Sequence, residues 1–296
     1  MLKSKIKFAR PARKKVSAFS LQPSAFAWSA FTLIEMLVVI AILGIMAALT
    51  VPVLKNFAKS DATLGASRQL LDGVARARQL AISQHTTVYM VFMPANFWNN
   101  SAWWSTLAPA QQTAVTNLCD KQLTGYTFIA RGAMGDQPGQ HAWHYLAPWQ
   151  SLPDGTFIAW TKFTNSLAGP PYIITDLINS VKSYDIYGFA TNAIPFPTAT
   201  NTSLIFPCLA FNYLGQLTVD GQTVAGRDEY IPIAKGSVLV VKDPVTKAFL
   251  LPIPPDPGSP DVAENPPGNS TNSSYNIVHI DRLTGRAVLE YQKMAP

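Results

Sequence analysis

One carboxylate stands alone in a long apolar stretch of this chain. Residues 31–54 form a run of 24 residues in which Glu35 is the only charged side chain. An ionised carboxylate is costly in hydrocarbon, so a lone Glu indicates either a helix end at headgroup depth or a partner charge supplied on assembly. In the second case Glu35 sets the register between neighbouring subunits and performs no catalysis.

The length and flanks of this stretch predict a membrane-spanning helix. At 1.5 Å per residue it is about 36 Å long, which is enough to cross a bilayer and too long for an ordinary secretory signal. Residues 1–30 hold seven basic side chains and no acidic one, which leaves 16 basic against 17 acidic side chains in the rest of the chain. The positive-inside rule therefore keeps residues 1–30 in the cytoplasm and exports everything after residue 54.

The residues around Glu35 resemble the type III signal of type IV pilins and of type II secretion pseudopilins. The matching positions, preceded by a basic leader and a small residue, are Phe31, Thr32, Leu33, Ile34 and Glu35. The resemblance implies that a prepilin peptidase cuts between Ala30 and Phe31 and N-methylates Phe31. Counted from the cut, Pro52 is residue 22, where pilins often carry a helix-bending proline. The family usually has Gly before the cut, and this chain has Ala30.

Cleavage would create the partner that Glu35 needs. In a bundle of staggered helices, the new amino group of Phe31 can lie beside the Glu35 of a neighbouring subunit. Pairing two buried charges lowers the cost of leaving either one alone in lipid. This argument assigns Glu35 to assembly, and the resemblance implies the same role for Thr32, Leu33, Ile34 and Pro52; none of them is predicted to be catalytic.

Beyond the apolar stretch the chain predicts an α+β, pilin-like protein. Helical spacing of apolar residues continues past Pro52, so we expect one helix over residues 32–83 that bends or locally melts at Pro52. Residues 31–54 are its membrane and polymerisation half, and residues 55–85 are its amphipathic half. Residues 86–296 then form a periplasmic, β-rich, antiparallel head with loop insertions.

Several runs of β-branched and aromatic residues predict the strands of that head. A helix that leads into a strand over residues 70–92 resembles the GspH/FimT-like minor pseudopilins. The predicted strands cover residues 88–93, 126–130, 156–161, 204–206, 230–233, 238–241, 277–281 and 287–291. The last two flank residues 282–286, where Gly285 suits the positive φ of a hairpin turn.

The head is larger than this family needs, and three of its segments are interpreted as loop insertions. Residues 96–122 and 132–151 are rich in aromatic side chains. Residues 251–274 form a Pro-rich loop that we expect to be mobile or extended rather than packed. The tryptophans of the first two segments have two alternative roles. They could contact a secreted substrate or a neighbouring subunit, or they could fill an aromatic core, which is the commoner case. They are Trp103, Trp104, Trp143 and Trp149.

Two pairs of residues have spacings that chemistry can use. Cys119 and Cys208 both lie in the exported part, whose compartment permits a disulfide; two buried thiols are the alternative. His141 and His144 have the spacing of metal ligands on a helix, but they lie among aromatics near Gly139 and Pro148. With no Cys or acidic cluster beside them, a loop is favoured over a metal site, and we assign no metal.

The charged residues near the C-terminus offer weak signals for calcium and for DNA. Acidic side chains are too sparse to predict a calcium loop; they are Asp228, Glu229 and Asp281. Some FimT-like minor pilins bind DNA through basic residues near the C-terminus. Here the basic patch is thin, and an ordinary solvated hairpin is favoured over DNA binding; its members are Arg282, Arg286 and Lys293.

The sequence thus predicts a minor pseudopilin, a structural subunit of a type II secretion pseudopilus, with no enzymatic activity and no cofactor. The alternatives are a minor type IV pilus subunit for adhesion or DNA uptake, and a membrane-tethered periplasmic enzyme. The resemblance implies a prepilin peptidase and other pilins or pseudopilins as partners, and an assembly platform and ATPase indirectly. The protein would span the bacterial inner membrane once, with its head in the periplasm, before it enters the filament.

Overall fold

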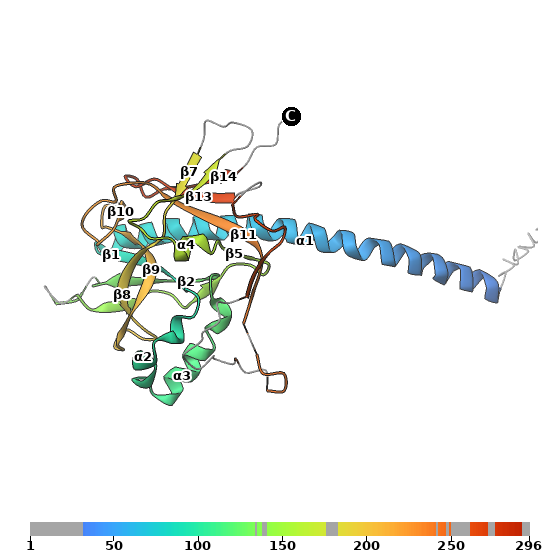
Figure 1. Ribbon diagram of the computed structural model, residues 1–296, viewed down its shortest axis with the longest axis horizontal. Helices are drawn as coiled ribbons and strands as arrows, with labels where there is room; N and C mark the ends of the chain where they lie inside the picture. The colour runs from blue at the N-terminus through green and yellow to red at the C-terminus, as the bar shows by residue number, and fades with distance from the viewer. Residues whose placement is uncertain are drawn as a thin grey trace, which may run out of the picture. The chain divides into compact units, whose positions relative to one another are not determined.

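The computed structural model describes residues 32–133, 135–137, 141–175, 183–240, 242–246, 249, 261–271 and 276–291 (Figure 1). Of residues 48–61 it describes only the backbone. The chain divides into two compact units, Met1–Pro52 and Val53–Pro296. The described residues combine a long N-terminal helix with antiparallel sheets, which is consistent with the predicted pilin-like α+β class.

The helix predicted over residues 32–83 is α1 (Leu33–Gln84). Its backbone stays α-helical across Pro52, so the predicted local melting there is wrong. A proline removes one donor from the helical ladder, and a long helix on either side of it can accommodate that loss. The C-terminal part of α1 buries a stripe of small and aliphatic side chains at intervals of three or four residues, namely Ala66, Leu70, Val74, Ala77 and Ala81.

A seven-stranded antiparallel sheet packs against this stripe. Its strands run in the order β10-β9-β1-β2-β3, with β8 beside β9 and β4 beside β2. Their bounds are β1 (Thr87–Phe92), β2 (Gly125–Arg131), β3 (Trp143–Tyr145), β4 (Gln150–Ser151), β8 (Ala190–Pro195), β9 (Ser203–Phe211) and β10 (Leu217–Thr218). The chain's first strand, β1, is central because it pairs with both β2 and β9.

Both faces of β1 are buried, which explains its unbroken run of apolar residues. Val88, Met90 and Phe92 belong to the core cluster that contains the α1 stripe. Tyr89 and Val91 point to the other face of the sheet and belong to a second, aromatic-rich cluster. The side chains alternate because successive residues of a strand face opposite sides.

A second sheet has five strands in the order β12-β11-β13-β14, with β5 beside β11. Its bounds are β5 (Thr156–Ile158), β11 (Glu229–Leu239), β12 (Asp261–Glu264), β13 (Asn276–Ile280) and β14 (Ala287–Tyr291). Ile231, Val278 and Ile280 join the same core as the α1 stripe, so the helix is covered by residues of both sheets (Figure 1). A separate two-stranded ribbon pairs β6 (Tyr172–Thr175) with β7 (Ser183–Ile186).

Four of the predicted strands need correction. The predicted strands 230–233 and 238–241 are one strand, β11, which continues through Gly236 at a φ of 149°. The predicted strand 156–161 ends at residue 158, and a short helix α4 (Thr161–Thr164) follows it. The predicted strand 204–206 covers only part of β9. Local composition did not reveal these limits because they depend on which partner strand is present.

The insertions are more ordered than the sequence predicted. Residues 96–122 contain η1 (Phe97–Asn99), α2 (Ser101–Ser105), α3 (Pro109–Thr116) and η2 (Cys119–Lys121), and residues 132–151 contain β3 and β4. Within the predicted Pro-rich loop 251–274, β12 pairs with β11, and Asn269 and Ser270 are buried. Residues 251–260 and 272–275 lie outside the described part of the chain.

Candidate functional site

The first turn of α1 is capped by a side chain from the predicted signal. The backbone N–H of Glu35 donates to Oγ1 of Thr32 at 3.2 Å, and the N–H of Met36 donates to the Thr32 carbonyl at 3.1 Å. Thr32 is therefore the N-cap, and Glu35 stands three residues later, where its negative charge favours the positive end of the helix dipole. A Thr three residues before a Glu is the sequence signal for such a cap, a role that the assignment of Thr32 to assembly alone overlooks.

The following turns of α1 expose apolar side chains on every face. Eleven large hydrophobic residues between positions 33 and 46 are each more than two-fifths exposed. They are Leu33, Ile34, Met36, Leu37, Val38, Val39, Ile40, Ile42, Leu43, Ile45 and Met46. A helix whose side chains are apolar on every face is suited to surroundings that are apolar on every side.

Several predicted site residues lie outside the described part of the chain. These are Ala30 and Phe31 at the predicted cut, and the side chain of Pro52. Leu33, Ile34 and Glu35 are described and all exposed. The cut, the N-methylation of Phe31 and the assembly role of Pro52 therefore stay predictions.

Residues 29–51 match the family described as the prokaryotic N-terminal methylation motif. The matched range contains the predicted cut, Glu35 and the exposed apolar turns. The motif is of the type IV pilin type and suggests a pilin-like or pseudopilin subunit; the match covers 23 of the 296 residues. The chain as a whole matches no curated protein and no solved structure.

Among the described residues, no helix is both long enough and apolar enough to cross a membrane. The predicted span, residues 31–54, includes Phe31 and the side chains of residues 48–54, which are outside what the structure describes. The membrane span stays a prediction.

The head contains a buried ion pair that the sequence analysis missed. Lys162 in α4 donates from Nζ to Oε1 of Glu229, the first residue of β11. Lys162 also donates to the Tyr187 carbonyl at 2.7 Å, and its Nζ lies 4.8 Å from the centre of the Phe189 ring. Burial lowers the pKa of Lys162 and raises the pKa of Glu229, while each partner's charge opposes the shift of the other. The two residues are 67 positions apart, so no local pattern could have indicated the pair.

The acidic residues weighed for calcium have separate protein partners. Glu229 pairs with Lys162, and Oδ2 of Asp228 lies 3.0 Å from Nε2 of His279. Asp281 accepts the backbone N–H of Thr284 at 2.7 Å, which lowers the pKa of the Asp281 carboxyl. No group of three or more His, Cys, Asp or Glu side chains that could hold a metal occurs in the described residues.

The predicted hairpin at the C-terminus is confirmed, and its cationic side chains are partly engaged. β13 and β14 pair around a turn at which Gly285 has a φ of 62°. Arg282 donates from Nη1 to the Gly226 carbonyl at 2.7 Å, while Arg286 is exposed. Lys293 lies outside the described residues. The guanidinium of Arg282 thus helps to hold the turn in place.

The cysteines and histidines are placed by the sheets. Cys119 and Cys208 are free, buried thiols in the aromatic-rich cluster, and burial raises the pKa of each to about 12. His144 belongs to β3 and not to a loop; its Nε2 lies 2.9 Å from Oδ2 of Asp136. His141 is exposed.

The tryptophans divide between core and surface. Trp103 is buried in the aromatic-rich cluster, stacked at 5.7 Å on Phe196. Trp104, Trp143 and Trp149 are partly buried against the same cluster. The structure therefore assigns Trp103 to the core and leaves part of the other three indoles accessible.

Proposed function

We propose that this chain is a minor pseudopilin, a structural subunit of a type II secretion pseudopilus that assembles through the N-terminal part of α1. The observation that carries this proposal is the set of eleven exposed apolar side chains between positions 33 and 46, interrupted by one carboxylate. Such a surface suits lipid in the monomer and other helices in a filament. The motif match over the same residues supports the assignment.

Assembly would exchange lipid contacts for contacts between helices. Glu35 would then pair with the amino group created at Phe31 of a neighbouring subunit, because an unpaired charge among apolar helices is costly. The carboxylate would thereby select one stagger between subunits.

We also propose a structural and not an enzymatic role for the head. Its most buried charges, Lys162 and Glu229, neutralise each other and join α4 to the second sheet. Asp228 and Asp281 accept backbone N–H groups in the turn of the β13–β14 hairpin. These contacts give all four charged side chains a role in stabilising the fold.

Processing is the first test of this function. Mass spectrometry of the mature chain should find a terminus at Phe31 with one added methyl group. Ala30→Leu should block the cut because the peptidase site needs a small residue, whereas the matched change Ala30→Gly should leave it intact. Functional protein that begins at Met1 would contradict the assignment.

The second test addresses Glu35. Glu35→Ala should leave the amount of chain in the inner membrane unchanged and reduce its recovery in sheared or purified filaments at least about tenfold. The control is Asp72→Ala, which removes an exposed carboxylate from the head part of the same helix. Loss of secreted cargo supports the pseudopilus, whereas loss of surface pili with normal secretion identifies a pilus subunit. Wild-type recovery of Glu35→Ala would refute the assembly role.

A further inference from the structure

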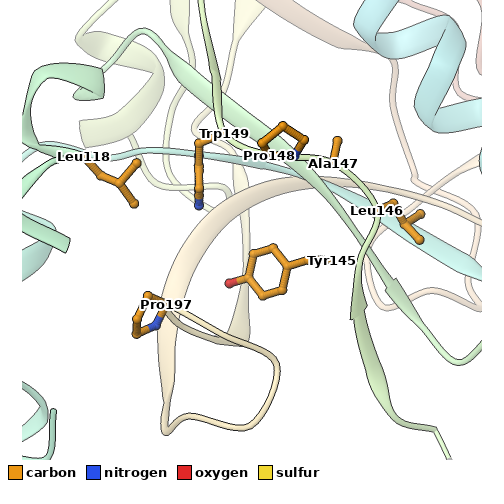
Figure 2. A pocket seen from close by; sticks show the side chains of 7 residues that line it. All are labelled: Leu118, Tyr145, Leu146, Ala147, Pro148, Trp149 and Pro197. Atoms are coloured by element: carbon orange, nitrogen blue, oxygen red, sulfur yellow. The ribbon is translucent and has the colours of Figure 1, made fainter. Parts of the chain in front are cut away.

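The head has an aromatic groove of about 630 Å³ (Figure 2). We define the groove by Leu118, Tyr145, Pro148, Trp149 and Pro197, which lie on three separate segments of the head. Leu118 lies between α3 and η2, the next three residues lie at or just after the end of β3, and Pro197 follows β8. None of the described residues that line the groove is charged.

Buried partners fix the shape of this groove. The Trp149 ring packs edge-on against Phe196 at 6.0 Å and lies 6.2 Å from Phe206, and both phenylalanines are buried. Tyr145 donates its hydroxyl hydrogen bond to the Pro195 carbonyl at 2.6 Å, which holds its ring in one orientation. Because these rings are already ordered, a ligand would bind without a large entropic cost of arranging them.

The groove offers one hydrogen-bond donor that suits a carbonyl acceptor. The indole nitrogen of Trp149 points into the space between Leu118, Tyr145 and Pro197 (Figure 2). Among the described residues, no group accepts a hydrogen bond from this indole nitrogen. The nitrogen is also not among the fully buried atoms that lack a partner, so a ligand can reach it. An indole N–H donates only, and it therefore selects an oxygen acceptor.

A polyproline II segment has the properties that this groove selects. Its backbone carbonyls have no internal partners, and its proline rings pack on aromatic and proline side chains. With three residues per turn, prolines at positions i and i+3 share one face. The groove is uncharged and offers one hydrogen-bond donor, the indole N–H of Trp149. It therefore suits an uncharged proline face with free carbonyls better than it suits a charged ligand.

The chain itself contains a proline-rich segment whose prolines have this spacing. Residues 251–260 include five prolines, and three pairs of them are three residues apart: Pro252 with Pro255, Pro254 with Pro257, and Pro257 with Pro260. Phe249, two residues before the segment, packs against the same aromatic-rich cluster as Trp149. Every copy of the protein thus carries one groove and one proline-rich segment.

We propose that the aromatic groove binds the proline-rich segment 251–260 of a second copy. Groove and segment are different surfaces, so the contact between copies is heterologous. Repetition of a heterologous contact builds an open helical filament when the rotation between copies does not close a ring. The inference deepens the proposed function, since it rests on that function for the filament setting. It adds a contact between heads to the contact between helices.

Peptide binding tests the groove directly. The probe is a fluorescein-labelled peptide of residues 250–261, titrated against the full chain in detergent and followed by anisotropy. Trp149→Ala should weaken binding at least about tenfold, and Trp149→Phe should weaken it by less because the ring remains. Trp104→Ala, which changes a partly buried tryptophan outside the groove, is the matched control and should bind normally. A peptide with alanine at residues 254, 255 and 257 should not bind.

Cross-linking tests whether the occupant comes from a second copy. Chains with benzoylphenylalanine in place of Pro255 are mixed with tagged chains and irradiated. A cross-linked dimer joined at the groove residues is expected, and it should disappear with Trp149→Ala in the tagged chain.

Three results would overturn the proposal: no peptide binding, equal binding by Trp149→Ala with a normal far-ultraviolet spectrum, or cross-links only within one chain. Because peptide binding requires no filament, its failure is distinguishable from a failure of the Glu35 test.

Discussion

The two parts of α1 show how one helix can be built for two kinds of surroundings. Between residues 33 and 46 the apolar side chains are large and exposed on every face. Between residues 66 and 81 the buried positions form one stripe, mostly of alanines, against the sheets. Small residues let the second part approach the strands closely; a methyl group added at Gly73, for example, would lie only 3.0 Å from the Met90 side chain. The large exposed side chains of the first part suit the contact between helices that the proposed assembly requires.

This contrast predicts that the stability of a single chain resides in the head and its part of α1. The largest expected effect is at the buried ion pair. Lys162→Met should destabilise the head by about 3–5 kcal/mol, because it leaves Glu229 buried without its partner. The free energy of unfolding by urea, measured for the full chain in detergent, checks this value.

A double variant serves as the control for the ion pair. Lys162→Met combined with Glu229→Leu removes both charges and should recover much of the lost stability. If the double variant lost the sum of the two single losses, the pair would not act as a unit.

The same substitution in each part of α1 tests the comparison most directly. Leu70 is fully buried, and Leu70→Ala should lower the free energy of unfolding by about 2–5 kcal/mol. Leu43 is 58% exposed, and Leu43→Ala should change it by less than about 0.5 kcal/mol. Leucine and alanine are both strong helix formers, so helix propensity contributes little to either result.

Substitutions in the first part of α1, which hardly change the free energy of unfolding, should have the larger effect when incorporation into filaments is measured. Leu43→Ala should reduce recovery in filaments more than a stability-matched surface change in the head, because residues 33–46 supply the proposed contact between subunits. Equal unfolding losses from Leu70→Ala and Leu43→Ala would show that the first part of α1 already packs within one chain.

The smallest expected effect concerns the buried thiols of the head. With a pKa of about 12, only about one Cys119 or Cys208 thiol in ten thousand is ionised at pH 8, so iodoacetamide should modify neither in the folded chain. An exposed cysteine introduced as Leu283→Cys should react readily and serves as the control. Rapid modification of the native thiols would show that the aromatic-rich cluster opens.

The same pKa shifts give a pH dependence of stability. In the unfolded chain these thiols ionise near pH 9, while in the folded chain they remain protonated up to about pH 12. Because the folded-state pKa is the higher one, the stability contributed by the thiols is present below pH 9 and is lost as the pH rises above it. The double change Cys119→Ala and Cys208→Ala should remove that part of the alkaline decline in the urea midpoint.

Local signals predicted the elements whose residues report on their immediate surroundings. The helix predicted over residues 32–83 is α1 within one residue at each end, and the hairpin turn at Gly285 was found from its turn residues. The helices between residues 97 and 121 were missed because each is short and owes its order to packing on the far face of β1 and β2. The length of β11 was underestimated because β5, β12 and β13 pair with different parts of it.

The sequence alone determined the features that depend on neighbouring residues: the basic segment before residue 30, the lone Glu35 in an apolar run, the methylation motif and the extent of α1. Only the tertiary structure decided which tryptophans are buried, that Lys162 meets Glu229, and that Tyr145, Trp149 and Pro197 share one groove. Helical periodicity and motif spacing involve residues that are close together in the sequence, so they can be recognised from the sequence directly. Contacts between residues dozens of positions apart depend on how the sheets pair, which no local pattern specifies.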